Sequence, residues 1–272
     1  MTEQARAPRP LAAITGGSSG IGKAFAEALG PTHDLLLIAR DEDRLAAVAL
    51  DVRSRFGSAV DVLAADLSSD AGIELAAQRL AAEPALAMLI NDAGFGSRGL
   101  FWETDFAGQV AMHQVHVMAT MRLTHAALGQ MVARNAGTII NVSSIAAFMR
   151  RAGSVSYCST KSWVATFTEG LYLELESVGS RVRVQALCPG FTYSNFHAAA
   201  GIADRSKVAP ASYWMTAQAV VAASLAALPS GKPIVIPGRR YQWISFLYST
   251  VPTPLRLYLE SPRRPSFARL SK

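Results

Sequence analysis

The chain has 272 residues, half of them apolar, which is enough for one large α/β domain around a substantial core. Its net charge is +6, but residues 232–272 alone carry +7 and residues 1–231 sum to −1, so one basic segment gives little reason to expect nucleic-acid binding. No apolar run is long enough to span a membrane, and residues 1–10 are expected to form a loose polar tail that lacks the regions of a secretion signal.

Seven apolar runs of strand-like composition alternate with helical patterns along the chain. The expected strands are residues 11–15, 34–39, 60–65, 87–91, 138–143, 182–187 and 234–236. The expected helices are residues 20–29, 41–56, 70–81, 105–134, 157–178 and 216–228. This alternation predicts a doubly wound, Rossmann-type α/β fold: a single domain with a parallel sheet of about seven strands and helices on both faces. Ligands of such folds bind beyond the carboxyl ends of the strands.

The first expected strand runs into the glycine-rich segment Thr15-Gly16-Gly17-Ser18-Ser19-Gly20-Ile21-Gly22, and an Ala-rich helical stretch follows. Strand, glycine turn and helix are the context that a dinucleotide site requires, because glycines let the backbone approach a pyrophosphate and the helix N-terminus offers N–H groups. The spacing G-x-x-x-G-x-G differs from the common G-x-G-x-x-G. Glycine-rich loops also form ordinary turns, so this segment needs support from elsewhere.

The end of the second expected strand bears on the choice of cofactor. Enzymes that use NAD usually have an acid there for the ribose 2′-hydroxyl, whereas this chain has Arg40. An arginine can bind a 2′-phosphate, so the sequence predicts NADP(H) in preference to NAD(H), with help from Ser18 and Arg44. The alternative is that Arg40 is a solvated charge beside Asp41 and Glu42.

Tyr157 and Lys161 stand four residues apart in an expected helix, and Ser144 follows the fifth expected strand. At this spacing the phenol and the ammonium share one helix face, so the lysine charge can favour the phenolate. A serine hydroxyl can hold a substrate oxygen against the phenol. These three side chains predict proton transfer to or from a carbonyl or alcohol, which requires a separate hydride carrier.

The glycine-rich loop and the Tyr157–Lys161 pair together resemble the short-chain dehydrogenase/reductase superfamily. Further matches occur in the family's order: Asp66-Leu67, Asn91-Asp92-Ala93-Gly94, Asn141-Val142-Ser143-Ser144 and Pro189-Gly190. The resemblance extends from Leu11 to Pro237. It implies a homodimer or homotetramer and an oxidoreductase that interconverts a carbonyl and an alcohol.

The resemblance also implies roles for single residues. Tyr157 would be the acid–base residue, Lys161 would lower its pKa and hold the nicotinamide ribose, and Ser144 would orient the substrate carbonyl. The cofactor contacts it implies are Gly16, Ser18, Ser19, Gly20, Ile21, Gly22, Arg40, Asp66, Leu67, Asn91, Ala93, Gly94, Tyr157, Lys161, Pro189, Gly190 and Thr192.

Two positions depart from the family pattern. His116 stands where many members have an asparagine that helps to hold a water near the lysine, and Asp92 replaces a common asparagine. An imidazole could still hold that water or relay protons, so His116 joins the candidate catalytic residues, or it could weaken the relay. No metal site is expected, because His113 and His116 have no evident third ligand and Cys158 and Cys188 lack metal-ligand spacing. The free cysteines indicate a reducing, cytoplasmic compartment.

A substrate loop is expected at residues 191–215. Its large apolar side chains are Phe191, Tyr193, Phe196, Tyr213, Trp214 and Met215. Others fall in loops at the same edge: Phe95, Phe101, Trp102, Phe148 and Met149. These groups favour an apolar or aromatic small-molecule substrate over a sugar phosphate, although Arg150 and Arg151 leave room for an acidic group.

The chain is expected to divide into the tail 1–10, a catalytic domain 11–238 and a basic, aromatic extension 239–272. Contact of the extension with an anionic membrane is one interpretation, but prolines interrupt its apolar stretches and favour a short helix packed on the domain or on a partner subunit. The sequence thus predicts an NADP(H)-dependent oxidoreductase. The alternative is a dinucleotide-binding regulatory or scaffold protein that has lost turnover.

Overall fold

The computed structural model describes residues 9–194 and 209–261. Its strands are β1 (Leu11–Thr15), β2 (Asp34–Ala39), β3 (Val60–Ala64), β4 (Leu86–Asn91), β5 (Thr138–Val142), β6 (Arg183–Leu187), β7 (Thr192–Tyr193), β8 (Met215–Thr216) and β9 (Ile234–Val235). Its α-helices are α1 (Gly20–Leu29), α2 (Glu42–Phe56), α3 (Asp70–Ala81), α4 (Phe106–His113), α5 (Thr120–Ala133), α6 (Val155–Ser177), α8 (Ala217–Ala227), α9 (Arg239–Thr250) and α10 (Thr253–Glu260). The expectations for residues 1–8 of the N-terminal tail, for residues 195–208 of the substrate loop, which include Phe196, and for residues 262–272 of the basic extension lie outside the described residues.

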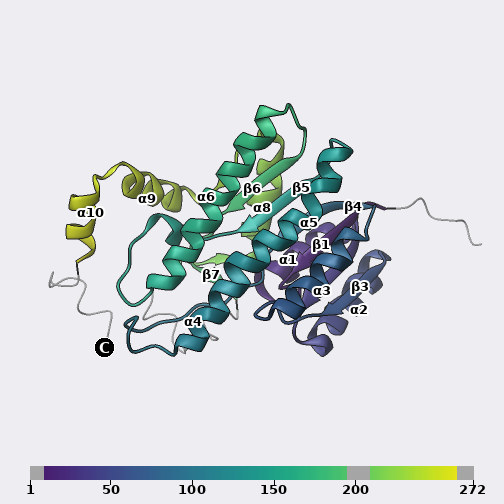
Figure 1. Cartoon of the computed structure of the whole chain (residues 1–272), viewed down its shortest axis with the longest axis horizontal. Helices are drawn as coiled ribbons and strands as arrows, with labels where there is room; N and C mark the ends of the chain where they lie inside the picture. Colours follow the sequence, from purple (N-terminus) through teal and green to yellow (C-terminus); the bar gives the residue numbers. More distant parts are fainter. Residues whose placement is uncertain (1–8, 195–208, 262–272) are drawn as a thin grey trace, which may run out of the picture.

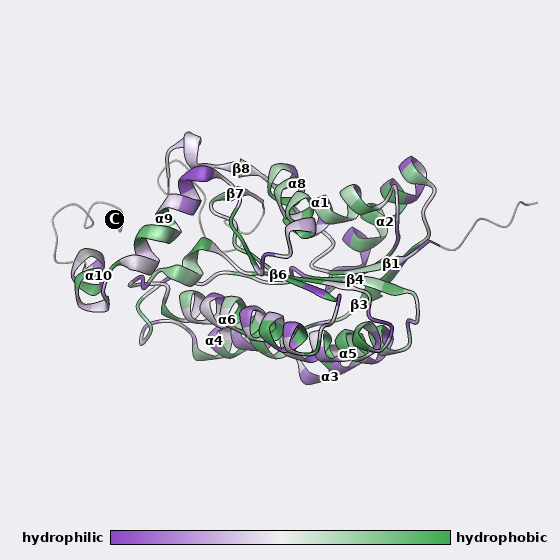
Figure 2. Cartoon of the chain, turned by 90° about the horizontal axis from the view of Figure 1, so that it is seen from above, coloured by the Kyte–Doolittle hydropathy of each residue, from purple (hydrophilic) through white to green (hydrophobic). Residues whose placement is uncertain are grey.

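Seven of these strands form one parallel sheet in the order β3-β2-β1-β4-β5-β6-β9. From β1 the strands β2 and β3 are added on one side, and β4 and the later strands are added on the other side. The gap between β1 and β4 is therefore the topological switch point, where ligands of doubly wound folds bind. Figure 2 shows α1, α2 and α8 on one face of the sheet and α3, α4, α5 and α6 on the other. The predicted Rossmann-type fold is confirmed, with strand boundaries that differ from the expected ones by at most one residue.

The core lies in two layers because successive residues of a strand point to opposite faces of the sheet. Ile14 packs in the layer with Phe25 of α1, and its neighbour Ala13 packs in the layer with Leu80 of α3. Phe25 is fully buried, so its truncation to alanine would cost about 3–5 kcal/mol of the free energy of unfolding. Because helices cover both faces of the sheet, side chains on both sides of each strand are buried, and the strands appear in the sequence as continuous apolar runs.

One long helix was the expectation for residues 105–134, and the structure divides this segment into three parts. Between α4 and α5 the backbone takes a π-helical form over Gln114–Ala119. Wide turns of this kind inside helices are frequent at functional sites. Here the turn contains His116, whose side chain is buried.

Two features beyond the seven-stranded sheet shape the substrate side. The short strands β7 and β8 form a separate parallel pair that the sequence does not reveal. The extension continues as α9 and α10, which lie at the opposite end of the molecule from β3 (Figure 1). None of the helices in the described part of the chain is long and apolar enough to cross a membrane.

Candidate active site

A cavity of about 580 Å³ opens beyond the carboxyl ends of the central strands. It brings together segments that are far apart in the sequence. The expected residues that line it are Gly16, Ser18, Ser19, Gly20, Ile21, Arg40, Gly94, Ser144, Tyr157, Lys161, Pro189, Gly190 and Thr192. This agreement follows from topology, since most of these segments come directly after a parallel strand, and Tyr157 and Lys161 are supplied by α6 beside the end of β5.

The glycine-rich loop has the backbone conformation that its glycines allow. Gly16 and Gly20 have φ angles of 72° and 58°, in the left-handed region that favours glycine. A Cβ on Gly22 would stand 2.4 Å from the carbonyl oxygen of Gly16, so the loop closes tightly against α1. Ser19 precedes α1 without a side-chain capping bond. The N–H of Gly22 is bonded to Asp92, which leaves the N–H groups of Gly20 and Ile21 for an anion. The loop therefore fits a pyrophosphate.

Arg40 lines the cavity at the end of β2. The neighbouring acid, Asp41, pairs with Arg44 at 3.0 Å and caps α2 by accepting the N–H of Arg44. Arg40 forms no ion pair within residues 9–194 and 209–261. Its charge contributes to the lowered pKa of Asp66, after the larger effect of two hydrogen bonds from Ser68. The arrangement thus leaves Arg40 available for a phosphate.

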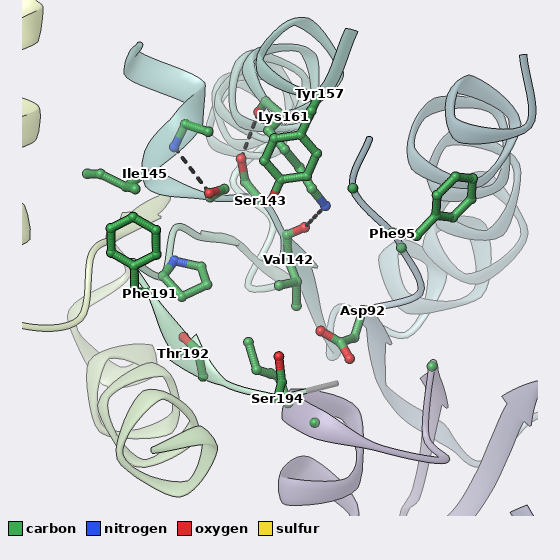
Figure 3. Close-up of a pocket in the computed structure, with 18 of the residues that line it drawn as sticks. Asp92, Phe95, Val142, Ser143, Ile145, Tyr157, Lys161, Phe191, Thr192 and Ser194 are labelled. Atoms are coloured by element: carbon green, nitrogen blue, oxygen red, sulfur yellow. Dashed lines mark hydrogen bonds between the residues drawn. The ribbon is translucent and has the colours of Figure 1, made fainter. Parts of the chain in front are cut away.

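The three candidate catalytic side chains meet beside the end of β5. Figure 3 shows Tyr157 and Lys161 projecting from α6 toward Val142. Lys161 Nζ donates a 2.9 Å hydrogen bond to the carbonyl oxygen of Val142 and lies 5.9 Å from the ring centroid of Tyr157. Ser144 is hydrogen-bonded to the hydroxyl of Tyr157, and its Oγ accepts the N–H of Ala146.

Burial dominates the titration of this site. It raises the pKa of Tyr157 to about 12, with the hydrogen bond to Ser144 acting in the opposite direction. Burial lowers the pKa of Lys161 to about 8, and the nearby Asp92 carboxylate opposes that shift. The phenol is therefore less acidic than the sequence leads one to expect, because burial disfavours the phenolate and outweighs the hydrogen bond to Ser144. Lys161 directs its ammonium group to the carbonyl oxygen of Val142.

Asp92 connects the glycine-rich loop with the lysine, a contact that the sequence does not identify. Its Oδ2 atom would lie 2.9 Å from a Cβ on Gly22 and 3.2 Å from one on Gly16. Desolvation raises the pKa of the Asp92 carboxyl to about 8, while the charge of Lys161 and a hydrogen bond from the Gly22 N–H act to lower it. Asp92 thus lies beneath the cofactor loop and faces the site in Figure 3.

His116 uses both ring nitrogens within the protein. Nε2 accepts the N–H of Phe95 at 3.1 Å, which leaves Nδ1 as the donor to Thr160 Oγ1 at 2.9 Å. Thr160 in turn donates to the carbonyl oxygen of Tyr157. Burial, assisted by the charge of Lys161, lowers the pKa of His116 well below its usual value. A proton relay through this ring would require one of these hydrogen bonds to break.

Some expected cofactor residues are not among those that line the cavity. They are Gly22, Asp66, Leu67, Asn91 and Ala93. The Asn91 side chain donates to Asn141 Oδ1 and to Thr124 Oγ1, and Asn141 donates to Thr168. This buried chain of hydrogen bonds ties β4 and β5 to α5 and α6, which positions the strand ends rather than contacting a ligand directly.

Apolar groups line the substrate end of the cavity, where Phe95, Met149, Phe191 and Tyr213 follow the expectation. Tyr241 and Ile244 of α9 also line it, although they belong to the extension that was set apart at residue 239. The sequence offers no local signal for this contact, because α9 reaches the cavity only through tertiary packing. No group of three or more potential metal ligands occurs in the described part of the chain.

Comparison with known proteins agrees with this geometry. The family model described as short chain dehydrogenase matches residues 10–203. An NADP-dependent 3-hydroxy acid dehydrogenase of Schizosaccharomyces pombe is 33% identical over 198 residues, which span 71% of this chain and 76% of that protein. An uncharacterized oxidoreductase of Staphylococcus saprophyticus is 32% identical over 182 residues, or 66% of this chain and 77% of the relative.

Solved structures extend the similarity to the C-terminal region. A short-chain dehydrogenase from Sphingobium yanoikuyae in complex with NADPH is 32% identical with a TM-score of 0.80, and the match covers 94% of this chain and 97% of that one. A bulky-bulky ketone specific alcohol dehydrogenase from Comamonas testosteroni is 28% identical with a TM-score of 0.75, over 91% and 96% of the two chains. With the cavity described above, these matches show that the chain belongs to the short-chain dehydrogenase family of oxidoreductases.

Proposed function

We propose that this protein is an NADP(H)-dependent oxidoreductase that interconverts a carbonyl and an alcohol on a largely apolar small molecule. One observation carries the proposal. A single cavity is lined by the glycine-rich loop, by Arg40 at the end of β2, and by Ser144, Tyr157 and Lys161. A nucleotide cradle and an acid–base group in one cavity are what hydride transfer coupled to proton transfer requires.

The residues of the cavity fit a nicotinamide dinucleotide. The glycine-rich loop and the start of α1 would hold the pyrophosphate, and Arg40 would bind a 2′-phosphate. The preference for NADP(H) is supported by the absence of an ion pair on Arg40 among the described residues and by the pairing of Asp41 with Arg44. The NADP dependence in the name of the S. pombe relative and the NADPH in the Sphingobium structure agree with it.

In the reductive direction, NADPH held in this cavity would supply the hydride for the carbonyl carbon. Ser144 donates a hydrogen bond to the carbonyl oxygen and holds it against the hydroxyl of Tyr157. The phenolic proton moves to that oxygen, so an alcohol forms and the phenol becomes a phenolate. The charge of Lys161 stabilises the phenolate once the ammonium leaves the carbonyl of Val142. In the oxidative direction the phenolate accepts the proton of the alcohol.

The substrate end suits an apolar or aromatic molecule because Phe95, Met149, Phe191, Tyr213 and Ile244 contribute to its walls. Burial of an aromatic or aliphatic group against these side chains would gain about 25 cal/mol for each Å² removed from water. The ketone specificity in the name of the Comamonas enzyme agrees with a carbonyl substrate of this kind.

A direct test follows NADPH oxidation by the purified protein against a panel of apolar and aromatic aldehydes, ketones and quinones, with NADH in parallel. We expect reduction of some of these carbonyls, with a higher kcat/KM for NADPH than for NADH. Tight binding of NADPH without turnover in either direction would instead identify a dinucleotide-binding regulatory protein.

A further inference from the structure

The substrate end of the cavity is also lined by two arginines, Arg98 and Arg151, that the proposed chemistry does not use. Arg98 lies in the loop between β4 and α4, and Arg151 lies just before α6. A 3.2 Å hydrogen bond from the N–H of Gly99 to the carbonyl oxygen of Gly153 joins these two segments. Because the glycines are one and two residues away from the arginines, the bond brings the backbone segments of the two arginines together, and both arginines line the cavity.

The two guanidinium groups are close enough to repel each other. Partial burial lowers the pKa of Arg98, and the charge of Arg151 adds to that shift. Neither arginine forms an ion pair within the parts of the chain that the structure describes. Two like charges held together beside apolar walls are unfavourable unless an anion lies between them.

The carboxylates around the cavity are committed elsewhere. Glu260 of α10 accepts the backbone N–H of Arg150 at 2.8 Å, and it interacts electrostatically with Arg150 and Arg256. Asp41 pairs with Arg44 at the cofactor end, and Asp92 lies beneath the glycine-rich loop. None of these contacts neutralises the pair at the substrate rim.

Arg150 provides a comparison within the same segment. Its guanidinium donates to the carbonyl oxygens of Ala147 and Met149, and it is not among the residues that line the cavity. The sequence named Arg150 and Arg151 as side chains that could bind an acidic group of the substrate. In the structure only Arg151 lines the cavity. Arg98, which the sequence did not single out, is its partner.

We propose that the substrate carries an anionic group, a carboxylate or a phosphate, that binds between Arg98 and Arg151 while its carbonyl lies beside Tyr157. Guanidinium groups form paired, charge-assisted hydrogen bonds with both anions. The apolar walls between the rim and Tyr157 suit a hydrocarbon or aromatic spacer. This inference rests on the proposed oxidoreductase function and adds the substrate class to it.

The test uses a series of keto acids of increasing length, each offered as the free acid, the methyl ester and the corresponding ketoalkyl phosphate, with NADPH and the full-length protein. The variants are Arg98→Gln and Arg151→Gln, with Arg150→Gln as the matched control.

For keto acids of the right length we expect an anionic form to exceed the ester by about tenfold or more in kcat/KM, mainly through a lower KM. Either rim variant should remove this preference, lowering kcat/KM for the anion about tenfold or more relative to that for the ester. Arg150→Gln should retain the preference, and added salt should weaken it.

The ranking of acid and phosphate identifies which anion the rim selects. Reduction of the esters as efficiently as both anions at every length would overturn this inference and leave the proposed function intact. An unchanged preference for the anion in both rim variants would also overturn it. If none of these compounds is reduced, the carbonyl panel described above decides the proposed function, and calorimetric titration of the NADPH complex decides the inference separately. Binding of the anions but not of the esters, lost in both rim variants, would support it, and any other pattern would refute it.

Discussion

The ring of Tyr241 occupies the space in which residue 190 would carry a side chain, since a Cβ on Gly190 would stand 2.0 Å from Cζ of Tyr241. The hydroxyl of Tyr241 accepts the N–H of Phe191 at 3.0 Å and donates to the carbonyl oxygen of Tyr213 at 2.5 Å. One buried phenol on α9 therefore joins the segments that lead into β7 and β8, and both segments line the cavity.

Tyr241→Phe should test this junction, because the variant keeps the ring and removes both hydrogen bonds. The unpaired N–H of Phe191 should cost about 1–3 kcal/mol of the free energy of unfolding. We expect a lower melting temperature and a higher KM for substrate, with little change in the Kd of NADPH. Tyr248→Phe, on the same helix but away from the cavity lining, is the control. An unchanged melting temperature and KM would show that the hydroxyl has no such role.

Tyr157→Phe should remove the transferable proton and leave the ring in place. Turnover should fall by about two orders of magnitude or more, while NADPH binding persists. Steady-state kinetics on a responsive carbonyl and a fluorescence titration with NADPH check the two halves of this expectation. Near wild-type reduction rates in the variant would refute the assigned role.

Arg40→Ala should weaken NADP(H) far more than NAD(H), because only NADP(H) presents a phosphate to the lost charge. A charge-assisted hydrogen bond of about 1.5–3 kcal/mol corresponds to a tenfold to more than hundredfold loss of affinity. Arg44→Ala is a useful comparison, since Arg44 already pairs with Asp41. Equal weakening of both cofactors in Arg40→Ala would contradict the preference for NADP(H).

His116→Leu should leave the N–H of Phe95 without its acceptor and destabilise the fold by about 1–3 kcal/mol. The hydroxyl of Thr160 loses the hydrogen bond from His116 but keeps its bond to the carbonyl oxygen of Tyr157. The pKa of His116 is lowered in the folded state, so the unfolded chain binds the proton first on acidification. The buried, neutral imidazole of His116 therefore makes its full contribution to the free energy of unfolding above about pH 6.5. This contribution decreases as the pH falls toward the lower pKa of the folded state.

His116→Asn separates structure from proton relay, since an amide can accept one of the two hydrogen bonds and carries no titrating group. Chemical denaturation across pH should show a smaller acid dependence in the asparagine variant. If the imidazole itself relays protons, the pH–rate profile should also lose an ionisation. Identical stability and rate profiles in all three proteins would make His116 a simple packing residue.

Asp92→Asn should stabilise the protein increasingly as the pH rises from about 4 to about 8. The pKa of Asp92 is raised to about 8 in the folded state, so over this interval the unfolded chain releases the proton first and the wild type loses stability. The carboxylate also raises the pKa of Lys161, and its removal should move the alkaline limb of the pH–rate profile to lower pH. Denaturation curves and rate profiles that match the wild type would contradict both expectations.

Most of the fold was predictable because each strand is covered on both faces and reads as an apolar run between turn residues. Leu35, Leu36, Leu37 and Ile38 in β2 are an example: all four are buried, two in each layer of the core. The site motifs were predictable for a related reason, since residues that follow successive parallel strands must meet at one edge of the sheet. Local sequence was sufficient for both.

What could not be predicted depends on contacts between distant residues or on a choice between alternative partners. Lys161 could pair with Tyr157 by spacing, but in the structure it bonds to Val142, nineteen positions earlier in the chain. The burial that sets the pKa of Asp92 comes from packing against the glycine-rich loop, about seventy residues away. Tyr241 is one aromatic residue among several in a basic segment, and only tertiary packing distinguishes it.

The docking of α9 also bears on how the protein is made. The nucleotide cradle, from β1 to the end of β2, leaves the ribosome early, whereas Tyr241 and Ile244 follow the last strand of the sheet. A nascent chain can therefore assemble its cofactor-binding half first, and domains generally fold in this direction during synthesis. The substrate wall closes only after α9 has emerged, so the nucleotide-binding segments come together before the substrate site is complete. A chain interrupted after β9 would be a nucleotide-binding protein without a completed substrate site.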